Sequence, residues 1–421
     1  MQPIFNEFIK FLNDKTGKKC SLNAGIYWLD NGFVKAFTKD GELHKLYKYK
    51  VFDDLSISFE KHKDYVEESF ETWEETIVRM SDHLDAKVNE SLAVIKDVCE
   101  QYSDSDMWVL TSTGKDSTVV VDLVKRVIPD IKVMFNNTSL DCADSYKLVK
   151  SHPEWIVTNP KVGFYQWCKA ENFIPTRFSR ACCSIFKEGA SIKYFSEHNI
   201  DKLMLFMGVR NAESTARANR QYIEHNPKWT NPNWMSCLPI RTWDDLDIWL
   251  YMLREKLEIN TKYNKGYTRV GCGISCPYYT KSTWVLDKYW YSNMYDRWHK
   301  TLNEVFIQNK RWSRMNCTVE EYHSCWNGGL IRISPTEEVI QEMMNYTGLD
   351  RDTAEKYFNK TCCECGSNVR HGDVLGMNYK YLSLNTEKVY CKRCLKKLLG
   401  IKESEWNENI ARFKDQGCKL F

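Results

Sequence analysis

A run of small polar residues near residue 115 has the composition of a phosphate-binding turn. Its members are Ser112, Thr113, Gly114, Lys115, Asp116 and Ser117. An apolar run at 107–110 precedes it and another begins at Val119, which predicts a strand, a turn and a helix N-terminus. That arrangement points unpaired backbone N–H groups at an anion, and Lys115 adds a point charge. The spacing is not Walker A, which has two glycines five residues apart before Lys and Ser/Thr.

Cysteines form the second chemical signal, because many of the 17 lie in three groups. The N-terminal sequence lacks the layout of a secretory signal, so metal or redox roles are expected rather than structural disulfides. Two C-x-x-C pairs near the C-terminus predict a tetrathiolate zinc module, with the 25 residues between them forming a hairpin. The predicted ligands are Cys362, Cys365, Cys391 and Cys394. Cys363 is a competing ligand in the first pair.

Composition bounds the class of protein. A chain of 421 residues with 43% hydrophobic and 27% charged residues is typical of a globular protein with two to three domains. No apolar run approaches the roughly 18 residues of a membrane span, so no membrane role and a cytoplasmic localisation are expected. The net charge of +3 is too small to indicate a nucleic-acid partner by itself.

Apolar runs at 107–110, 131–135, 155–158 and 203–208 alternate with helical patterns, which predicts a doubly wound α/β sheet with right-handed parallel crossovers. A helical stretch, interrupted once, is expected over 67–102. The N-terminal segment predicts a small β-containing module with a hairpin turn at 30–32. The expected domains are 1–68 (N-terminal module), 69–300 (nucleotide-binding), 301–358 (helical) and 359–421 (zinc).

Residues 112–117 resemble the pyrophosphate loop (SxGKDS) of the adenine-nucleotide alpha-hydrolase-like superfamily, which includes ATP pyrophosphatases and PAPS reductases. Residues 208–217 resemble the G-x-R-x-x-E-S-x-x-R motif of the PAPS reductase family, with every specified position matched. Residues 239–251 resemble a further family segment around Trp243, in which Asp244 should begin a helix. The resemblance spans about 70–300 and implies that Arg210 and Arg217 join residues 112–117 in binding the nucleotide.

The other cysteine groups are also similar to family elements. Cys182 and Cys183, flanked by the cations Arg177, Arg180 and Lys187, resemble a Cys-Cys pair, and the cations favour low thiol pKa values. Residues 269–277 resemble an R-x-G-C-x-x-C-P element. Cluster-bearing members bind a 4Fe–4S cluster with these four thiolates, which implies Cys182, Cys183, Cys272 and Cys276 here. This chain has three residues between the last two cysteines, and Gly273 is expected to absorb the extra length. Zinc or free thiols are the alternatives.

The intact GKDS sequence favours ATP over PAPS, because family members that reduce PAPS tend to have degenerate loops. We therefore expect an ATP pyrophosphatase-type sulfurtransferase that resembles the enzymes of Dnd-type DNA phosphorothioation or of RNA thiolation. Its expected cofactors are ATP, Mg²⁺, a 4Fe–4S cluster and Zn²⁺, with Lys115, Cys183 and Arg210 catalytic. A nucleic-acid substrate, a sulfur-donor protein and an oligomer are compatible with this hypothesis. The alternatives are a PAPS/APS reductase and a non-catalytic component that binds nucleotide or nucleic acid.

Overall fold

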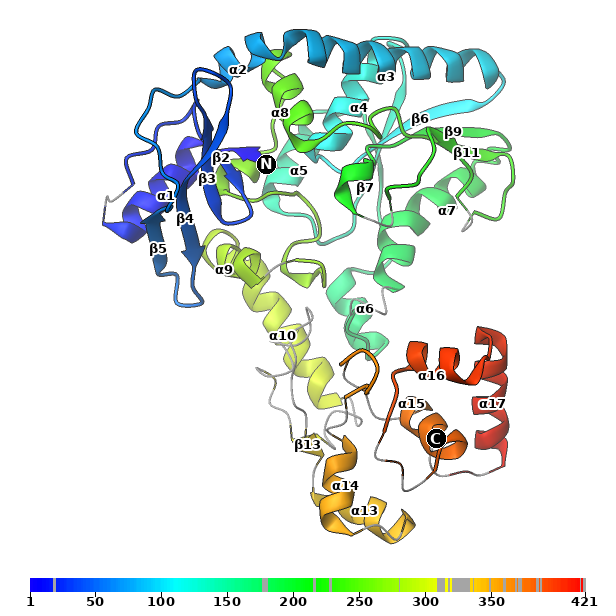
Figure 1. Cartoon of the computed structure of the whole chain (residues 1–421). Helices are drawn as coiled ribbons and strands as arrows, with labels where there is room; N and C mark the ends of the chain where they lie inside the picture. Colours follow the sequence, from blue (N-terminus) through cyan, green and yellow to red (C-terminus); the bar gives the residue numbers. More distant parts are fainter. Residues whose placement is uncertain are drawn as a thin grey trace. The chain divides into compact units, whose positions relative to one another are not determined.

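Six strands form the central sheet of the computed structural model (Figure 1). Their order is β10-β11-β9-β6-β7-β8, and only β10 is antiparallel to its neighbour. The bounds are β6 Asp106–Thr111, β7 Lys132–Asn136, β8 Ile156–Thr158, β9 Leu203–Phe206, β10 Ile223–Glu224 and β11 Trp234–Cys237. The chain builds β6, β7 and β8 in one direction and then returns to β9 on the other side of β6. Strand order therefore reverses between β6 and β9, the place where open α/β sheets bind ligands.

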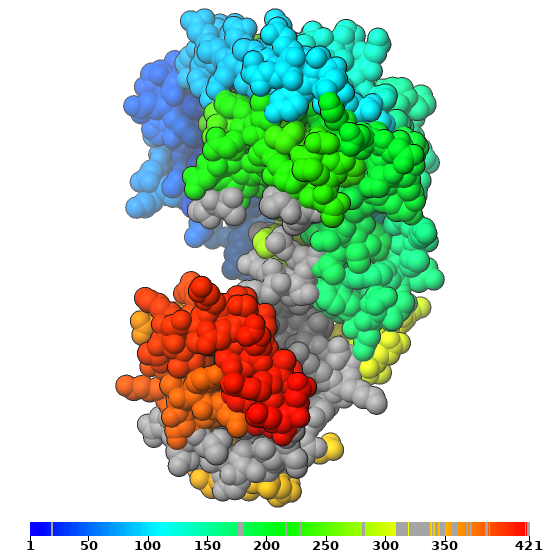
Figure 2. All heavy atoms as spheres, turned by 90° about the vertical axis from the view of Figure 1, so that its right-hand side faces the viewer, coloured from blue at the N-terminus to red at the C-terminus, as the bar shows by residue number. Residues whose placement is uncertain are grey.

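Helices cover both faces of this sheet, because successive strand residues point to opposite sides. Val109 and Phe206 pack into a core with α3 (Ser81–Gln101), α4 (Lys115–Lys125) and α8 (Asp245–Arg254). Trp108 and Leu205, one residue away on the same strands, pack with Phe195 of α7 (Gly189–Glu197) on the other face. In Figure 2 the cyan atoms of α3 lie directly against the green segment that contains α8. The doubly wound α/β class is confirmed.

The N-terminal segment is a five-stranded antiparallel sheet, β1 to β5 in sequence order. Its strands are β1 Gln2–Pro3, β2 Trp28–Asp30, β3 Phe33–Phe37, β4 Leu43–Val51 and β5 Ile57–Lys61. The predicted hairpin turn is confirmed, since Asn31 and Gly32 have φ of 49° and 83°, as a primed turn requires. Helix α1 (Asn6–Thr16) buries Phe8 and Leu12. The expected helical stretch is two helices, α2 (Trp73–Arg79) and α3, which meet at Met80.

The chain divides into two units, Met1–Thr301 and Leu302–Phe421. The structure describes residues 1–17, 20–175, 181–214, 217–226, 229–279, 281–308, 315–316, 319, 334–335, 337–347, 350–358, 361–367, 369, 373–383, 386, 388–416 and 418. The remaining helices of the first part are α5 Ala143–Lys150, α6 Phe164–Ala170, α9 Lys281–Trp290 and α10 Ser292–Gln308. After α10 come β12 Met315–Asn316, β13 Ser334–Pro335, α13 Glu337–Thr347, α14 Arg351–Phe358, α15 Asp373–Tyr381, α16 Lys392–Leu399 and α17 Glu403–Asp415.

The hairpin expected between the two C-x-x-C pairs is wrong, because α15 occupies the middle of that segment. Its side chains Leu375 and Tyr379 are buried with Val389 in a small core beside the cysteines. A buried helical face of this kind satisfies its own backbone hydrogen bonds and packs without a partner strand. The C-x-x-C spacing carries no information about the secondary structure between the pairs.

Gly208, two residues after β9, sets the distance between that strand's exit and α4. A Cβ atom at Gly208 would lie 2.7 Å from the backbone nitrogen of Ser117 and 2.7 Å from the carbonyl carbon of Asp116. We expect Gly208→Ala to lower the free energy of unfolding by about 1–3 kcal/mol, the usual cost of overpacking, in denaturant titrations of the full chain. Gly163→Ala is the control, because its Cβ would meet only Ser139 Oγ at 4.0 Å. Equal losses in the two variants would contradict the close approach.

Candidate functional site

The turn between β6 and α4 is held by side-chain hydrogen bonds. Ser112 N–H donates to Ser117 Oγ at 3.2 Å, and that hydroxyl donates to the Gly114 carbonyl at 2.9 Å. Thr113 has φ of 57°; its hydroxyl donates to Ser145 Oγ at 3.0 Å and accepts from Asn260 Nδ2 at 2.9 Å. The turn is therefore fixed from α4, from α5 and from the segment after α8, before any ligand binds.

Two cations meet where the strand order reverses. Lys115 is the first residue of α4 and Arg210 follows β9, and their side chains are only 7% and 3% exposed. Arg210 Nε lies 2.5 Å from Asp116 Oδ1, and Arg210 Nη2 lies 2.7 Å from Asp245 Oδ1. Lys115 Nζ lies 3.0 Å from Asp116 Oδ2 and 3.2 Å from Asp245 Oδ1. These four residues form a charge cluster of two cations and two carboxylates, named here the switch-point cluster.

The cluster keeps its members charged although it is largely buried. Burial is the largest influence on the pKa of Lys115 and would lower it, but Asp116, Tyr263 and Asp245 together outweigh burial and the pKa is raised. The pKa of Arg210 is likewise raised by Asp116 and Asp245 against the effect of burial. Burial would raise the pKa of Asp245, yet Lys115 and Arg210 hold it well below its usual value. Lys115, Arg210 and Asp245 therefore all carry charge at neutral pH.

Arg217 lies apart from the two buried cations. Its guanidinium is 39% exposed and pairs with Glu213, whose carboxylate also accepts the Arg210 backbone N–H at 2.9 Å. The structure therefore connects Arg217 to the loop only through Glu213, within the described residues. Two residues that sequence reasoning did not assign to the site lie closer: Asp245, and Tyr263, whose hydroxyl accepts the Lys115 N–H at 2.9 Å. The Asp-Asp pair at 244–245 was the only sequence signal for the first, and nothing marked the second.

The two halves of the predicted cysteine site come together. Cys182, Cys183, Cys272 and Cys276 line one pocket, which is also lined by apolar side chains and Lys187. Cys183 begins a π-helical turn (Cys183–Glu188), and the other pair flanks a 3-10 turn (Gly273–Ser275). Gly273 has φ of 61° and its carbonyl accepts the Cys276 N–H at 3.0 Å. The additional residue between Cys272 and Cys276 is thus taken up in a tight turn that favours glycine.

The distances between cysteine sulfurs bear on whether a site could hold one zinc ion or a 4Fe–4S cluster. Thiolates on one zinc ion lie no more than about 4.6 Å apart, twice the Zn–S bond. Among the described residues, three or more ligand atoms within 4.8 Å of one another occur only at the C-terminal cysteines. A 4Fe–4S cluster fits a wider arrangement, because each thiolate binds a different iron. Among the described residues the pocket thiols do not meet the single-ion spacing, and four thiolates are the donor set that a 4Fe–4S cluster uses.

The low thiol pKa expected for the Cys182–Cys183 pair is wrong for Cys182. A hydrogen bond with Cys183, together with burial, raises the pKa of Cys182, and burial raises the pKa of Cys272 to about 12. Lys187 lowers the pKa of Cys272, but its effect is smaller than that of burial. Arg177 and Arg180, the other two cations invoked, lie outside the described residues.

A buried lysine supports the turn that carries Cys272 and Cys276. Lys262 is fully buried, with its ammonium 3.1 Å from the Tyr279 hydroxyl and within 5.4 Å of the ring centroids of Tyr267, Tyr279 and Tyr291. Tyr267 donates to Asp287 Oδ1 at 2.7 Å, and Asp287 Oδ2 lies 3.8 Å from where a Cβ on Gly273 would be. Burying a lysine demands such compensation. The sequence showed a tyrosine-rich segment but not which charge it encloses.

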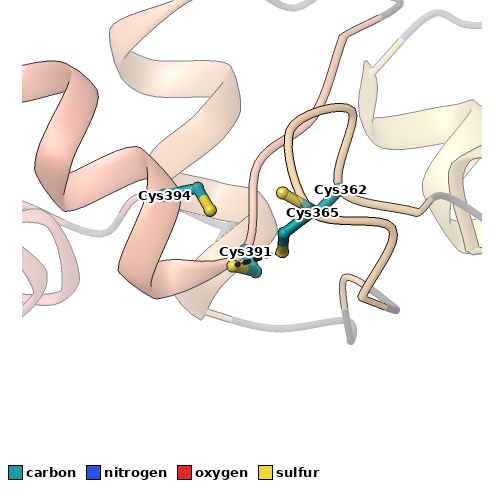
Figure 3. A group of neighbouring side chains, drawn as sticks. All are labelled: Cys362, Cys365, Cys391 and Cys394. Atoms are coloured by element: carbon teal, nitrogen blue, oxygen red, sulfur yellow. Dashed lines mark hydrogen bonds between the residues drawn. The ribbon is translucent and has the colours of Figure 1, made fainter.

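The C-terminal cysteines form a separate group that could hold a metal ion. The sulfurs of Cys362, Cys365, Cys391 and Cys394 all lie within 4.8 Å of one another (Figure 3). The first two sit in a turn closed by the Gly366 N–H on the Cys362 carbonyl at 2.8 Å, and the last two begin α16. Hydrogen bonding with Ser367 lowers the pKa of Cys365 to about 6. Cys363, the competing ligand, is exposed and outside the group.

Within the part of the chain that the structure describes, no helix is long and apolar enough to cross a membrane.

Known proteins resemble the region that holds the loop and the cysteine pocket. Residues 106–277 match the family model of the phosphoadenosine phosphosulfate reductase domain. Two uncharacterized proteins of Methanocaldococcus jannaschii are 30% and 27% identical over 277 and 272 residues, or 64% and 63% of this chain. The chain covers 53% and 62% of their lengths. The adenosine 5′-phosphosulfate reductase of Bacillus velezensis is 24% identical over 48% of this chain and 86% of its own.

The match begins at β6 and ends just after Cys276, so it contains the switch-point cluster and all four cysteines of the pocket. It leaves out the N-terminal sheet and the whole second unit. Residues 106–277 are therefore similar to the phosphoadenosine phosphosulfate reductase domain and to bacterial adenosine 5′-phosphosulfate reductases.

Proposed function

We propose that the chain is an adenine-nucleotide-dependent sulfur-transfer enzyme whose loop at 112–117 binds the phosphate groups of ATP. The observation that carries the proposal is the intact loop, Ser112 to Ser117, with Lys115 and Arg210 converging beside it where the strand order reverses. Its helix N-terminus and two buried cations suit a pyrophosphate leaving group. The four-cysteine pocket in the same domain suits sulfur chemistry.

In this proposal ATP adenylates an oxygen of the acceptor and releases pyrophosphate, and a sulfur nucleophile then displaces AMP. Lys115, Ser117 and Arg210 bind the pyrophosphate oxygens, Arg217 acts through Glu213, and Cys183 is the catalytic thiol. Mg²⁺ bound with the nucleotide would offset the remaining phosphate charge. Cys182, Cys272 and Cys276 would hold the 4Fe–4S cluster, which would supply an electron- or sulfur-carrying centre, and Cys183 would join them only if its thiol is not the catalytic one. The proposed acceptor is a nucleic acid, as in Dnd-type phosphorothioation or RNA thiolation, and a second protein would donate the sulfur.

A PAPS or APS reductase is the second candidate, and the similarity to bacterial adenosine 5′-phosphosulfate reductases supports it. In that reaction a cysteine thiolate attacks the sulfuryl sulfur and releases the nucleotide. The two candidates differ in nucleotide. Calorimetric titration of anaerobically purified protein with ATP and with APS or PAPS separates them, since the first requires tighter binding of ATP in the presence of Mg²⁺.

Loss of either switch-point cation should weaken ATP binding. We expect Lys115→Met and Arg210→Met to raise the Kd for Mg·ATP roughly tenfold or more, because each removes a charge-assisted hydrogen bond worth about 1.5–3 kcal/mol. Ser117→Ala should have a smaller effect in the same direction. Lys125→Met is the matched control, since it removes a lysine about 15 Å away at the other end of α4. If Lys115→Met, Arg210→Met and Ser117→Ala all leave the Kd for Mg·ATP unchanged, the loop is not part of the nucleotide site.

Anaerobically purified protein should contain iron and be coloured by thiolate–iron charge transfer. Cys272→Ser should lose both properties, because thiolates are the ligands that such clusters require. Cys99→Ser, which alters a half-buried cysteine of α3 outside the pocket, should keep them. Iron analysis and visible absorption provide the measurement. Wild-type protein without iron would refute the cluster and favour the non-catalytic alternative.

The C-terminal group should hold one structural zinc ion. We expect Cys391→Ser to lose zinc and to become sensitive to protease over 361–416, since a structural zinc contributes on the order of 10 kcal/mol to its module. Cys363→Ser is the control, because its exposed thiol lies outside the group, and it should retain full zinc content. Elemental analysis combined with limited proteolysis tests this, and a zinc-replete Cys391→Ser protein would contradict the assignment.

A further inference from the structure

Asp245 occupies an unusual place in the switch-point cluster. A single oxygen, Oδ1, lies 2.7 Å from Arg210 Nη2 and 3.2 Å from Lys115 Nζ, so it accepts from both cations at once. Its other oxygen accepts from the amino group of Met1 at 3.1 Å. The Asp245 side chain is 42% exposed, whereas the two cations are 7% and 3% exposed. Asp245 is therefore the solvent-facing member of the cluster.

The contacts of the Asp245 carboxylate are those that a protein makes with a bound phosphate group. Two convergent donors on an oxygen, one ammonium and one guanidinium, are the contacts that proteins use for phosphate oxygens. Asp116 also contacts both cations, but it belongs to the loop itself and is 19% exposed. Asp245 reaches the same pair from α8, a different element. Both carboxylates occupy donors of Lys115 and Arg210 that an arriving anion would use.

The helix that carries Asp245 does not need this side chain for its own N-terminus. Asp244 is the N-cap of α8, and its carboxylate accepts the Asp247 N–H at 2.9 Å. Asp247 returns the contact to the Asp244 N–H at 2.9 Å, which completes a capping box. The Asp245 carboxylate instead contacts Met1, Arg210 and Lys115, which all lie outside α8.

We infer that the Asp245 carboxylate occupies the position of a ligand phosphate group and is displaced when nucleotide binds. The inference rests on the proposed nucleotide site and adds a specificity-determining residue to it. A ligand must replace the charge-assisted hydrogen bonds that Arg210 and Lys115 make to Asp245. Orthophosphate or sulfate would only exchange these bonds for similar ones, so its binding free energy is small. A di- or triphosphate chain carries more charge and can also reach the loop N–H groups. Asp245 thereby selects polyphosphate chains over single oxyanions.

Asp245→Asn tests the inference, because it keeps the size of the side chain and removes its charge. Inorganic pyrophosphate is titrated calorimetrically into the full chain without divalent metal. We expect Asp245→Asn to bind pyrophosphate at least tenfold more tightly than the wild type, and the relative gain for orthophosphate to be larger still. Asp85→Asn is the matched control: it removes a 61%-exposed carboxylate that pairs with Arg254 on the surface, and its affinity should equal that of the wild type.

A second substitution tests whether the gain in pyrophosphate affinity depends on the switch-point cluster. In the Asp245→Asn background, Lys115→Met should abolish the gain, whereas Lys125→Met should preserve it. Unchanged, weaker or absent pyrophosphate binding by a folded Asp245→Asn protein overturns the inference. If Lys115→Met weakens ATP binding while Asp245→Asn brings no gain, only the inference fails. If Lys115→Met leaves ATP binding unchanged, the proposed nucleotide site itself fails.

Discussion

The pairing of two nearly buried cations with two carboxylates is the constraint around which the domain is arranged. A buried ammonium or guanidinium is stable only with a charged or hydrogen-bonded partner. Lys115 comes from α4, Arg210 from the segment after β9, and Asp245 from α8, so satisfying the charges fixes three elements relative to one another. Gly208 allows the segment after β9 to approach α4 closely, because it places no side chain between the end of that strand and the helix. The loop shape, the strand order and the charge cluster therefore depend on one another.

Burial also affects the charge of the thiols in the cysteine pocket. Its thiols are partly buried beside aromatic side chains, and a Cβ on Gly273 would lie 3.8 Å from Asp287 Oδ2. Desolvation outweighs the nearby cation and raises the pKa of Cys272. Metal binding would release the protons of such thiols. Cation count along the sequence was therefore a poor guide to thiol chemistry, because the sequence does not report how much water each thiol retains.

Much of the fold followed from local patterns. The apolar runs located β6, β7, β8 and β9 of the central sheet but not β10 or β11. The turn at 30–32 was correct because type I′ geometry depends on the residues of the turn itself. Strands β1 and β5 were missed: the first has two residues and the second has few buried side chains, so neither produces a clear alternation. The helix inside the zinc-module insert was missed because a pair of C-x-x-C motifs constrains its ligands and leaves the intervening chain free.

The sequence by itself determined the chemical groups and their order: a loop able to bind phosphate, arginines after a buried strand, and three groups of cysteines. These depend on residue types and short spacings, which are local properties. Only the tertiary structure decided which groups meet. It placed Arg210 against Lys115 and left Arg217 on Glu213, and it brought Cys182 and Cys183 to Cys272 and Cys276. It also placed Asp245 and Tyr263 beside the loop. Long-range contacts arise from how strands and helices pack, and residue spacing along the chain does not encode that packing.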